Sequence, residues 1–315
     1  MKSFALLLAV LAPAPCVAQT PVESELTFTN AGLTLHGTLT LPEGAGPWPG
    51  LVFVAGSGPT DRDGNSLAGL STDMYKQLAH GLALLGIASL RYDKRGLPSS
   101  EGTFDMAATT MEDFAHDATA AVRALQAISG IERIYLLGHS EGGTLALIAA
   151  RDGAPVRGLI LISTLGRPFS LVVREQLARQ LPEAMLAQFD TAWAAYLGAD
   201  SAVNYPPVLA SLFQPVNRRF VQSWEHANTP GLVAGLEVPI LIVQGETDVQ
   251  VTPADARALA AANPNATLEL LPGVNHVLKE AEGETAMAQM ASYTNAAIPL
   301  ATGVVALIAG WIRAH

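Results

Sequence analysis

The sequence contains a single cysteine, Cys16, and comparatively few basic residues. One cysteine excludes an intramolecular disulfide, so the fold must be stabilised by its apolar core. The 315 residues include 28 acidic residues and 18 Lys or Arg residues, which gives a formal net charge of -10. This acidic excess argues against nucleic acid or an anionic membrane surface as a partner, because both are bound through clustered basic residues. A small uncharged substrate fits the composition.

Long apolar runs are also scarce, and the two that stand out, at the ends of the chain, fall short of a membrane span. The chain opens with a basic residue and a short apolar stretch, which is typical of a secretory signal peptide. Cleavage after Ala18 would remove residues 1–18, Cys16 included, and leave the mature protein periplasmic or secreted. The alternative is a lipoprotein signal acylated on Cys16, but Pro13 and Pro15 interrupt the small, flexible run that such a signal requires.

The apolar pattern predicts an α/β fold. Period-two alternation over residues 26–41 predicts an N-terminal β-hairpin. The runs that follow are apolar on both faces and alternate with helical sequence. Together they predict a mixed, mostly parallel twisted sheet with helices on both faces. The expected strands lie at residues 51–55, 87–92, 134–137, 158–162, 239–243 and 266–271.

Residues 165–236 interrupt this alternation with amphipathic helical sequence rich in aromatic residues. We interpret this segment as a helical cap inserted over the C-terminal edge of the sheet, which divides the core into residues 19–164 and 237–315. Most of its aromatic side chains are expected to form the core of the cap, and some to face a pocket. At the C-terminus, residues 296–312 contain a proline and two glycines, and we expect a last covering helix there rather than a membrane anchor.

The most informative motif is Gly-His-Ser-Glu-Gly at residues 138–142, between an apolar run and helix-forming sequence. In this context Gly-x-Ser-x-Gly is a nucleophile elbow, which strains the serine backbone and exposes the hydroxyl. Ser140 is therefore the candidate nucleophile. The N–H of Glu141, at the start of the helix, would point toward the atom under attack. The side chain of His139 is expected to point away from the active face.

A serine nucleophile needs a base, and the base needs a carboxylate that fixes its tautomer. Of the seven histidines, His276 comes just after the last expected strand, where its ring can reach the C-terminal edge of the sheet. The acid is expected after the preceding strand. Asp248 is a better candidate than Glu246 there, because Gly245 makes the turn and the third residue after it projects over the edge of the sheet. The chain order Ser140, Asp248, His276 is the Ser, Asp, His order of a known hydrolase class.

A tetrahedral acyl-transfer intermediate needs two N–H donors for its oxyanion. Glu141 is expected to supply one. The loop Ala-Gly-Ser-Gly-Pro at residues 55–59 brings backbone close to the serine, and we choose the N–H of Ser57 as the second donor, although these residues could also be plain turn residues. Residues 61–65 look superficially like a calcium loop. Its glycine comes too early and Thr72 stands where the closing glutamate would be, so we expect no metal.

Taken together, these segments resemble an α/β-hydrolase, and within that superfamily the bacterial serine carboxylesterases grouped with serine aminopeptidase and proline-iminopeptidase-like enzymes. The resemblance rests on residues 56–65, 91–96, 138–143, 244–251 and 275–276. It implies an acyl-enzyme mechanism on carboxylic esters with a Ser-Asp-His triad and without a metal or cofactor. One departure is Ala55, which stands where many relatives have histidine before the oxyanion glycine.

We therefore expect a serine carboxylesterase acting on small-to-medium acyl esters, with the cap forming the acyl or the alcohol pocket. A thioesterase or lactonase would use the same triad. A non-catalytic binding protein on this scaffold would bind ligand without turnover. An aminopeptidase would need acidic residues to hold the substrate ammonium, and the cap offers Glu175, Glu183, Asp190, Asp200 and Glu225.

Overall fold

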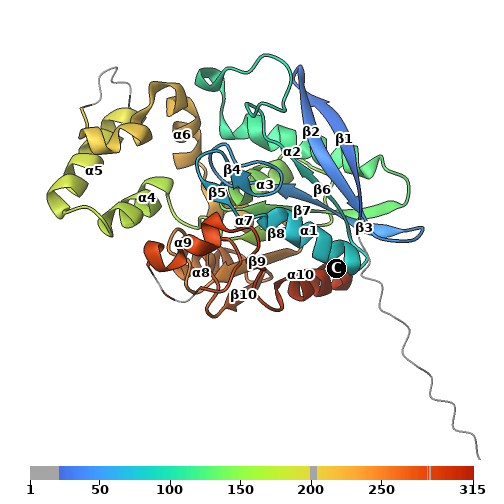
Figure 1. The fold of residues 1–315 in the computed structure, drawn as a ribbon. Coiled ribbons are helices and arrows are strands. Elements are labelled where there is room, and N and C mark those ends of the chain that lie inside the picture. Colours follow the sequence, from blue (N-terminus) through green and yellow to red (C-terminus); the bar gives the residue numbers. More distant parts are fainter. Residues whose placement is uncertain (1–20, 199–203, 282, 284) are drawn as a thin grey trace, which may run out of the picture.

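Figure 1 shows the fold in a computed structural model, which describes residues 21–198, 204–281, 283 and 285–315. The expected signal peptide, residues 1–18, lies outside the described residues. The first two strands and their inner neighbour pair antiparallel, and all other neighbouring strands of the main sheet pair parallel. Within the described residues this sheet has eight strands, in the spatial order β1 (Val22–Asn30), β2 (Leu33–Leu41), β6 (Ala88–Tyr92), β3 (Trp48–Val54), β7 (Ile131–His139), β8 (Gly158–Ile162), β9 (Ile240–Gly245) and β10 (Thr267–Leu271).

Helices cover both faces of this sheet, and β3 shows how one strand supplies two cores. Leu51 and Phe53 point to one face, whereas Val52 and Val54 point to the other, because successive side chains of a strand alternate. All four side chains are buried, which explains why the strand sequences are apolar on both faces. The first face is covered by α1 (Met74–Leu84) and α10 (Val304–Ala314), and the second by α2 (Met111–Gln126), α3 (Glu141–Arg151) and α8 (Pro253–Ala262).

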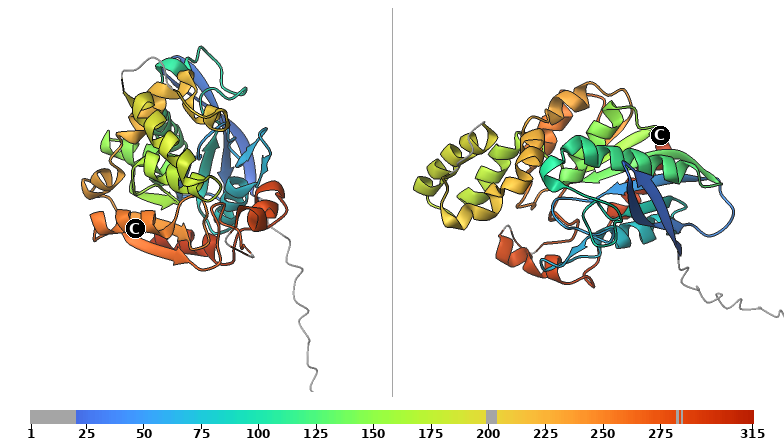
Figure 2. Two further views of the ribbon diagram at one scale, coloured as in Figure 1. Left: turned by 90° about the vertical axis from the view of Figure 1, so that its left-hand side faces the viewer. Right: turned by 90° about the horizontal axis from the view of Figure 1, so that it is seen from above.

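Between β8 and β9 the chain forms helices that project to one side of the sheet (Figures 1 and 2). Trp193, Tyr196 and Phe213 form a separate apolar core there, as expected for most of the aromatic residues. Phe220 and Trp224 instead join the core on the face covered by α2 and α3. The last helix of the segment packs against α3 and α8. The segment contains α4 (Phe169–Ala178), α5 (Glu183–Leu197), the short 3-10 helices η2 (Pro207–Phe213) and η3 (Pro215–Asn217), α6 (Arg218–Glu225) and α7 (Thr229–Ala234).

The C-terminal apolar run ends in the expected covering helix, since Ile308 and Ile312 of α10 are fully buried beside α1. In the part of the chain that the structure describes, we find no helix with both the length and the apolar character needed to cross a membrane. The smaller elements are the hairpin of β4 (Asn65–Ser66) and β5 (Leu70–Ser71), the 3-10 helix η1 (Met106–Ala108), and α9 (Ala286–Thr294), which packs against β5.

Candidate active site

Ser140 occupies a sharp turn between the end of β7 and the first residue of α3. Its φ of 56° and ψ of -119° lie in a region that residues other than glycine rarely adopt. The N–H of Ser140 donates to the carbonyl oxygen of Ile162 at 2.9 Å, which ties the turn to β8. The strand, the strained turn and the helix expected around this serine are therefore all present, at the C-terminal edge of the parallel strands.

Three glycines around Ser140 have no room for a side chain. A Cβ on Gly138 would lie 2.2 Å from the carbonyl oxygen of Gly142, and one on Gly142 would lie 2.1 Å from that of Val54. A Cβ on Gly143 would lie 1.9 Å from Thr164 Oγ1. The first turn of α3 can therefore pack against β3 and the residues after β8 only if these positions are glycine. The motif thus extends to residue 143.

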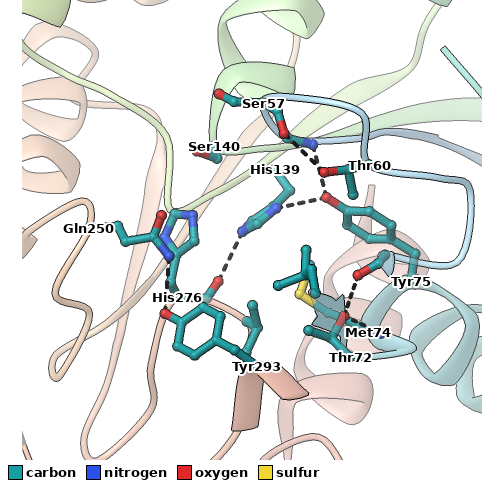
Figure 3. A pocket seen from close by; sticks show the side chains of 14 residues that line it. Ser57, Thr60, Thr72, Met74, Tyr75, His139, Ser140, Gln250, His276 and Tyr293 are labelled. Atoms are coloured by element: carbon teal, nitrogen blue, oxygen red, sulfur yellow. Dashed lines mark hydrogen bonds between the residues drawn. The ribbon is translucent and has the colours of Figure 1, made fainter. Parts of the chain in front are cut away.

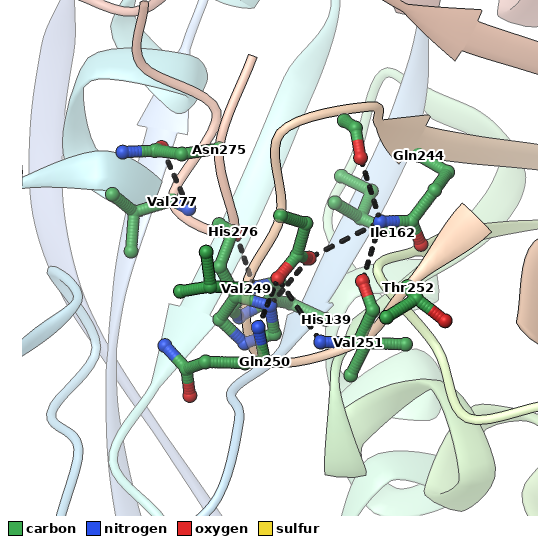
Figure 4. A network of polar contacts seen from close by, with 12 residues as sticks. His139, Ile162, Gln244, Val249, Gln250, Val251, Thr252, Asn275, His276 and Val277 are labelled. Atoms are coloured by element: carbon green, nitrogen blue, oxygen red, sulfur yellow. Dashed lines mark hydrogen bonds and ion pairs between the residues drawn. The ribbon is translucent and has the colours of Figure 1, made fainter. Parts of the chain in front are cut away.

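Asp248 and His276 are hydrogen-bonded to each other, although 28 residues separate them in the chain. His276 Nδ1 donates to Asp248 Oδ2 at 2.8 Å (Figure 4). The other carboxylate oxygen accepts from the N–H groups of Gln250 and Val251 at 2.7 and 3.0 Å, and Gln244 Nε2 donates to Oδ2 at 3.2 Å. Burial acts to raise the pKa of Asp248, but His276 and these donors outweigh it and hold the pKa below its usual value.

The loop that carries His276 is anchored by the preceding residue, Asn275, which is fully buried. Its Oδ1 accepts from the N–H groups of Val277 and Lys279, both at 3.1 Å, and its Nδ2 donates to Ser292 Oγ of α9 at 2.6 Å. These bonds fix the loop on both sides of the ring. Asn275 thus positions the base loop without touching the carboxylate itself.

Ser140 and His276 line the same cavity, which we call the small cavity and which has a volume of about 150 Å³ (Figure 3). Ser57, Gln250 and Tyr293 also line it. Among the hydrogen bonds of the described residues, none joins the Ser140 hydroxyl to the His276 ring. In hydrolases without substrate such a bond is often long and tightens only in the complex.

The two N–H groups expected to bind an oxyanion belong to segments that meet at Ser140. A Cβ on Gly56 would lie 3.4 Å from Ser140 Cβ, so the loop after β3 passes directly beside the serine. Neither the N–H of Ser57 nor that of Glu141 has a hydrogen-bond acceptor among the described residues. Both donors are therefore available to a ligand.

A buried ammonium group connects these two segments. Lys94 Nζ donates to the carbonyl oxygen of Gly56 at 2.5 Å and lies 3.2 Å from Glu141 Oε1. The side chains of Lys94 and Glu141 are only 6% and 4% exposed. The carbonyl of Gly56 and the N–H of Ser57 belong to one planar peptide unit, so a cation on the oxygen polarises the N–H at the other side. Lys94 therefore both holds this peptide and makes its N–H a stronger donor.

His139 does not point away from the site, and that expectation is wrong. Its ring lines the small cavity, where Nε2–H donates to the carbonyl oxygen of His276 at 2.9 Å and Nδ1 accepts from Tyr75 Oη–H at 2.8 Å (Figure 3). Tyr75 Oη accepts in turn from the N–H of Gly56 at 2.9 Å. Burial and the neighbouring His276 lower the pKa of His139 to about 3, so the ring is neutral, as this bonding requires. His139 continues the alternation of β7 on the face of Tyr135 and Leu137, and the positive φ at Ser140 leaves the serine at the same cavity as the ring.

A second cavity, which we call the large cavity, has a volume of about 430 Å³. It is lined by Gly58 and Glu141, the residues that directly follow Ser57 and Ser140 of the small cavity. The charged groups in its lining are paired inside the protein: Lys94 with Glu141, and Arg95 with Asp117, where the distance from Nε to Oδ2 is 2.6 Å. Six aromatic side chains line it: Phe104, Phe114, Phe169, Trp193, Phe220 and Trp224.

Four of the five acidic residues considered for binding an ammonium group are engaged elsewhere. The fifth, Asp200, lies outside the described residues. None of the other four lines either cavity. Glu175 pairs with Arg167 at 2.6 Å, Glu183 and Asp190 pair with Arg174 at 2.7 and 3.0 Å, and Glu225 accepts from the N–H and the hydroxyl of Ser170 at 2.8 and 2.6 Å.

The sequence analysis did not predict the roles that three residues have in the site: Lys94, Tyr75 and Gln244. Lys94 follows an apolar strand within a run of charged residues, and a charged residue at that position was the one local signal available. Tyr75 lies in the first turn of a helix and meets His139 across 64 residues of sequence, so no spacing rule points to it. Gln244 precedes the acid turn, and only its buried amide reveals that it holds Asp248.

Comparisons with known proteins identify the family of the chain. Residues 68–282 match the family described as "Serine aminopeptidase, S33". The chain belongs to this α/β-hydrolase family. It is 30% identical over 255 residues to Esterase EstD of Thermotoga maritima, covering 80% of this chain but only 60% of that protein. It is also 30% identical over 247 residues to a proline iminopeptidase of Lactobacillus delbrueckii, covering 66% of this chain and 81% of the relative.

Solved structures of α/β-hydrolases share the fold. Est1E of Butyrivibrio proteoclasticus, determined with ferulic acid bound, superimposes with a TM-score of 0.57 at 19% identity and covers 92% of this chain and 96% of its own. The predicted α/β-hydrolase fold and the predicted membership of the serine aminopeptidase-like group are confirmed.

Proposed function

We propose that this α/β-hydrolase is a serine carboxylesterase that cleaves small-to-medium acyl esters through an acyl-enzyme. The observation that carries the proposal is the hydrogen bond from His276 to the buried Asp248, with the His276 ring on the wall of the cavity that Ser140 also lines. A carboxylate on Nδ1 leaves Nε2 of the ring to take the serine proton.

In the proposed mechanism, Ser140 Oγ attacks the ester carbonyl while His276 accepts its proton. The oxyanion is bound by the N–H groups of Ser57 and Glu141, the first of them polarised by Lys94. Collapse of the intermediate expels the alcohol, which takes the proton from His276. Water then hydrolyses the acyl-enzyme by the same steps in reverse order. No step requires a metal or a cofactor.

An aminopeptidase is the alternative that the family description favours. It would have to bind the ammonium of its substrate, which requires an unpaired carboxylate in the pocket. Of the described residues that line the two cavities, Glu141 is the sole carboxylate, and Lys94 neutralises it. The paired acids of the cap segment likewise favour an uncharged ester. A thioester or lactone would meet the same machinery and the same walls.

The test compares p-nitrophenyl acetate, butyrate and octanoate with an aminoacyl p-nitroanilide, each with the wild-type protein and with Ser140→Ala. We expect ester hydrolysis that is lost in the variant, and no cleavage of the anilide. Cleavage of the anilide would replace the esterase by an aminopeptidase. Ligand binding without turnover that depends on Ser140 would indicate a binding protein on a hydrolase scaffold.

We also propose that the protein is exported to the periplasm or beyond and that residues 1–18 are removed. The support is the basic start and short apolar stretch of the sequence. Mass spectrometry of the intact protein from the expressing cells is expected to give an N-terminus at Gln19. A retained Met1 would contradict export by this route.

A further inference from the structure

Adjacent residues of the same two segments line the two cavities. Ser57 and Ser140 line the small cavity, whereas the next residue in each segment, Gly58 and Glu141, lines the large one. The two halves of an ester bound at Ser140, with its carbonyl oxygen toward these N–H groups, extend in different directions from the carbonyl carbon, and the two cavities offer a space for each half. The remaining question is which half enters which.

We propose that the large aromatic cavity takes the acyl group and the small cavity takes the alcohol, so that the preferred substrates are esters of aryl-bearing acids with small polar alcohols. This inference rests on the proposed esterase function. Which half of the ester enters which cavity follows from the position of the base, because His276 lines the small cavity and is absent from the lining of the large one.

The chemistry of the leaving group requires the alcohol to lie in the small cavity, beside His276. When the intermediate collapses, the bond from the carbonyl carbon to the alcohol oxygen breaks, and that oxygen takes the proton held by His276. The alcohol oxygen must therefore lie beside the ring, within hydrogen-bond reach. The acyl group stays bonded to Ser140 Oγ and has to extend away from the ring, toward Glu141 and the large cavity.

The walls of the two cavities support the same assignment of the acyl group and the alcohol. The large cavity, at about 430 Å³, has room for a phenyl ring and offers aromatic faces for edge or offset contacts. Its charged side chains are paired inside the protein, so it has no unpaired charge among the described lining residues to attract a charged acyl group. The small cavity, at about 150 Å³, presents polar groups that suit a short alcohol, from Thr60, Thr72, Tyr75, Gln250 and Tyr293.

Two isomeric esters test the assignment directly. Methyl phenylacetate carries its ring on the acyl side, and benzyl acetate carries it on the alcohol side, while atoms and molecular mass are identical. The acid that is released is measured by pH-stat titration. We expect kcat/KM for methyl phenylacetate to exceed that for benzyl acetate by at least about tenfold, because burying one ring in an apolar cavity contributes a gain of this size. Equal or inverted values would overturn the assignment.

The same assay separates failure of the inference from failure of the proposed function. If neither isomer nor p-nitrophenyl acetate is hydrolysed in a manner that depends on Ser140, the esterase function itself is wrong. If both isomers are hydrolysed by wild type and not by Ser140→Ala, the function stands, and the ratio between the isomers alone decides the assignment.

Two half-buried leucines, one in each cavity, provide matched variants. Leu212→Trp narrows the large cavity, and Leu70→Trp narrows the small one. Relative to methyl acetate, Leu212→Trp should lower hydrolysis of methyl phenylacetate about tenfold, and Leu70→Trp should lower hydrolysis of propyl acetate by a similar factor. Urea unfolding of both variants checks that they fold. The opposite pairing of variant and substrate would overturn the assignment even if the isomer ratio favoured it.

Discussion

Replacing Lys94 should separate its effect on stability from its effect on the reaction. Lys94→Met removes a cation from a pair that is almost fully buried and leaves the carboxylate of Glu141 without a counterion. Breaking one partner of a buried ion pair costs about 3–5 kcal/mol, so the free energy of unfolding should fall by that amount. The double variant with Glu141→Gln removes the stranded charge and should recover part of this loss, since an unsatisfied neutral group costs about 1–3 kcal/mol.

Catalysis should not recover in the double variant. Both variants lack the ammonium that holds the carbonyl of Gly56 and polarises the N–H of Ser57. Deleting an oxyanion donor outright costs about 10²–10³ in kcat, and weakening one should cost less, about 10- to 100-fold. Urea unfolding gives the stabilities, and steady-state hydrolysis of p-nitrophenyl acetate gives kcat. If the double variant returned to within about twofold of the wild-type kcat, the role of Lys94 would be to neutralise Glu141, and our reasoning about the peptide would be refuted.

Three further predictions follow from single contacts. Asp248→Asn should lower kcat by about 10⁴, because the amide stabilises the wrong tautomer of the base, and a loss below tenfold in ester hydrolysis would remove Asp248 from the triad. Gly143→Ala puts a Cβ 1.9 Å from Thr164 Oγ1, so the thermal midpoint of the variant should fall by several degrees, or the variant should not fold. An unchanged midpoint in a melting curve would contradict the packing around Gly143. The pKa of His139 is about 3 in the folded protein and near 6.5 when unfolded, so the unfolded chain binds more protons between these values and stability falls as the pH drops through this range. From pH 7 to pH 5 the loss from this ring should be about 2 kcal/mol in urea unfolding, and His139→Asn, which cannot titrate, should lack that slope.

A local motif identified Ser140, and one property of parallel sheets brought Asp248 and His276 to it. All three residues follow strands, and the C-terminal ends of parallel strands lie along one edge, so we could expect these residues to converge there. The contacts it missed depend on tertiary packing. Lys94 reaches Gly56 across 38 residues, and no local pattern records which buried carbonyl a lysine will find.

The cap segment also shows that local patterns do not predict tertiary packing. Its aromatic residues were expected to divide between a core and a pocket, and periodicity could not say which residue did which. Trp193 does both, because it is 5% exposed within the aromatic core of the segment and also lines the large cavity. A side chain with two faces can belong to two environments. A sequence assigns one hydrophobicity to the whole residue, so that division has to come from the packing.

The loop after β3 is held by hydrogen bonds to residues outside it. The N–H of Gly56 donates to the hydroxyl of Tyr75 on α1, and the carbonyl of Gly56 accepts from Lys94 after β6. Both polar groups of this one residue are therefore fixed by elements remote in sequence, and the adjacent N–H of Ser57 is aimed without any contribution from its own side chain. A donor that is held in place before substrate arrives needs no reorganisation when charge develops on the oxyanion. The loop can therefore consist of glycine and small residues, which keeps the approach to Ser140 open, while Tyr75 and Lys94 supply the order that such a sequence lacks.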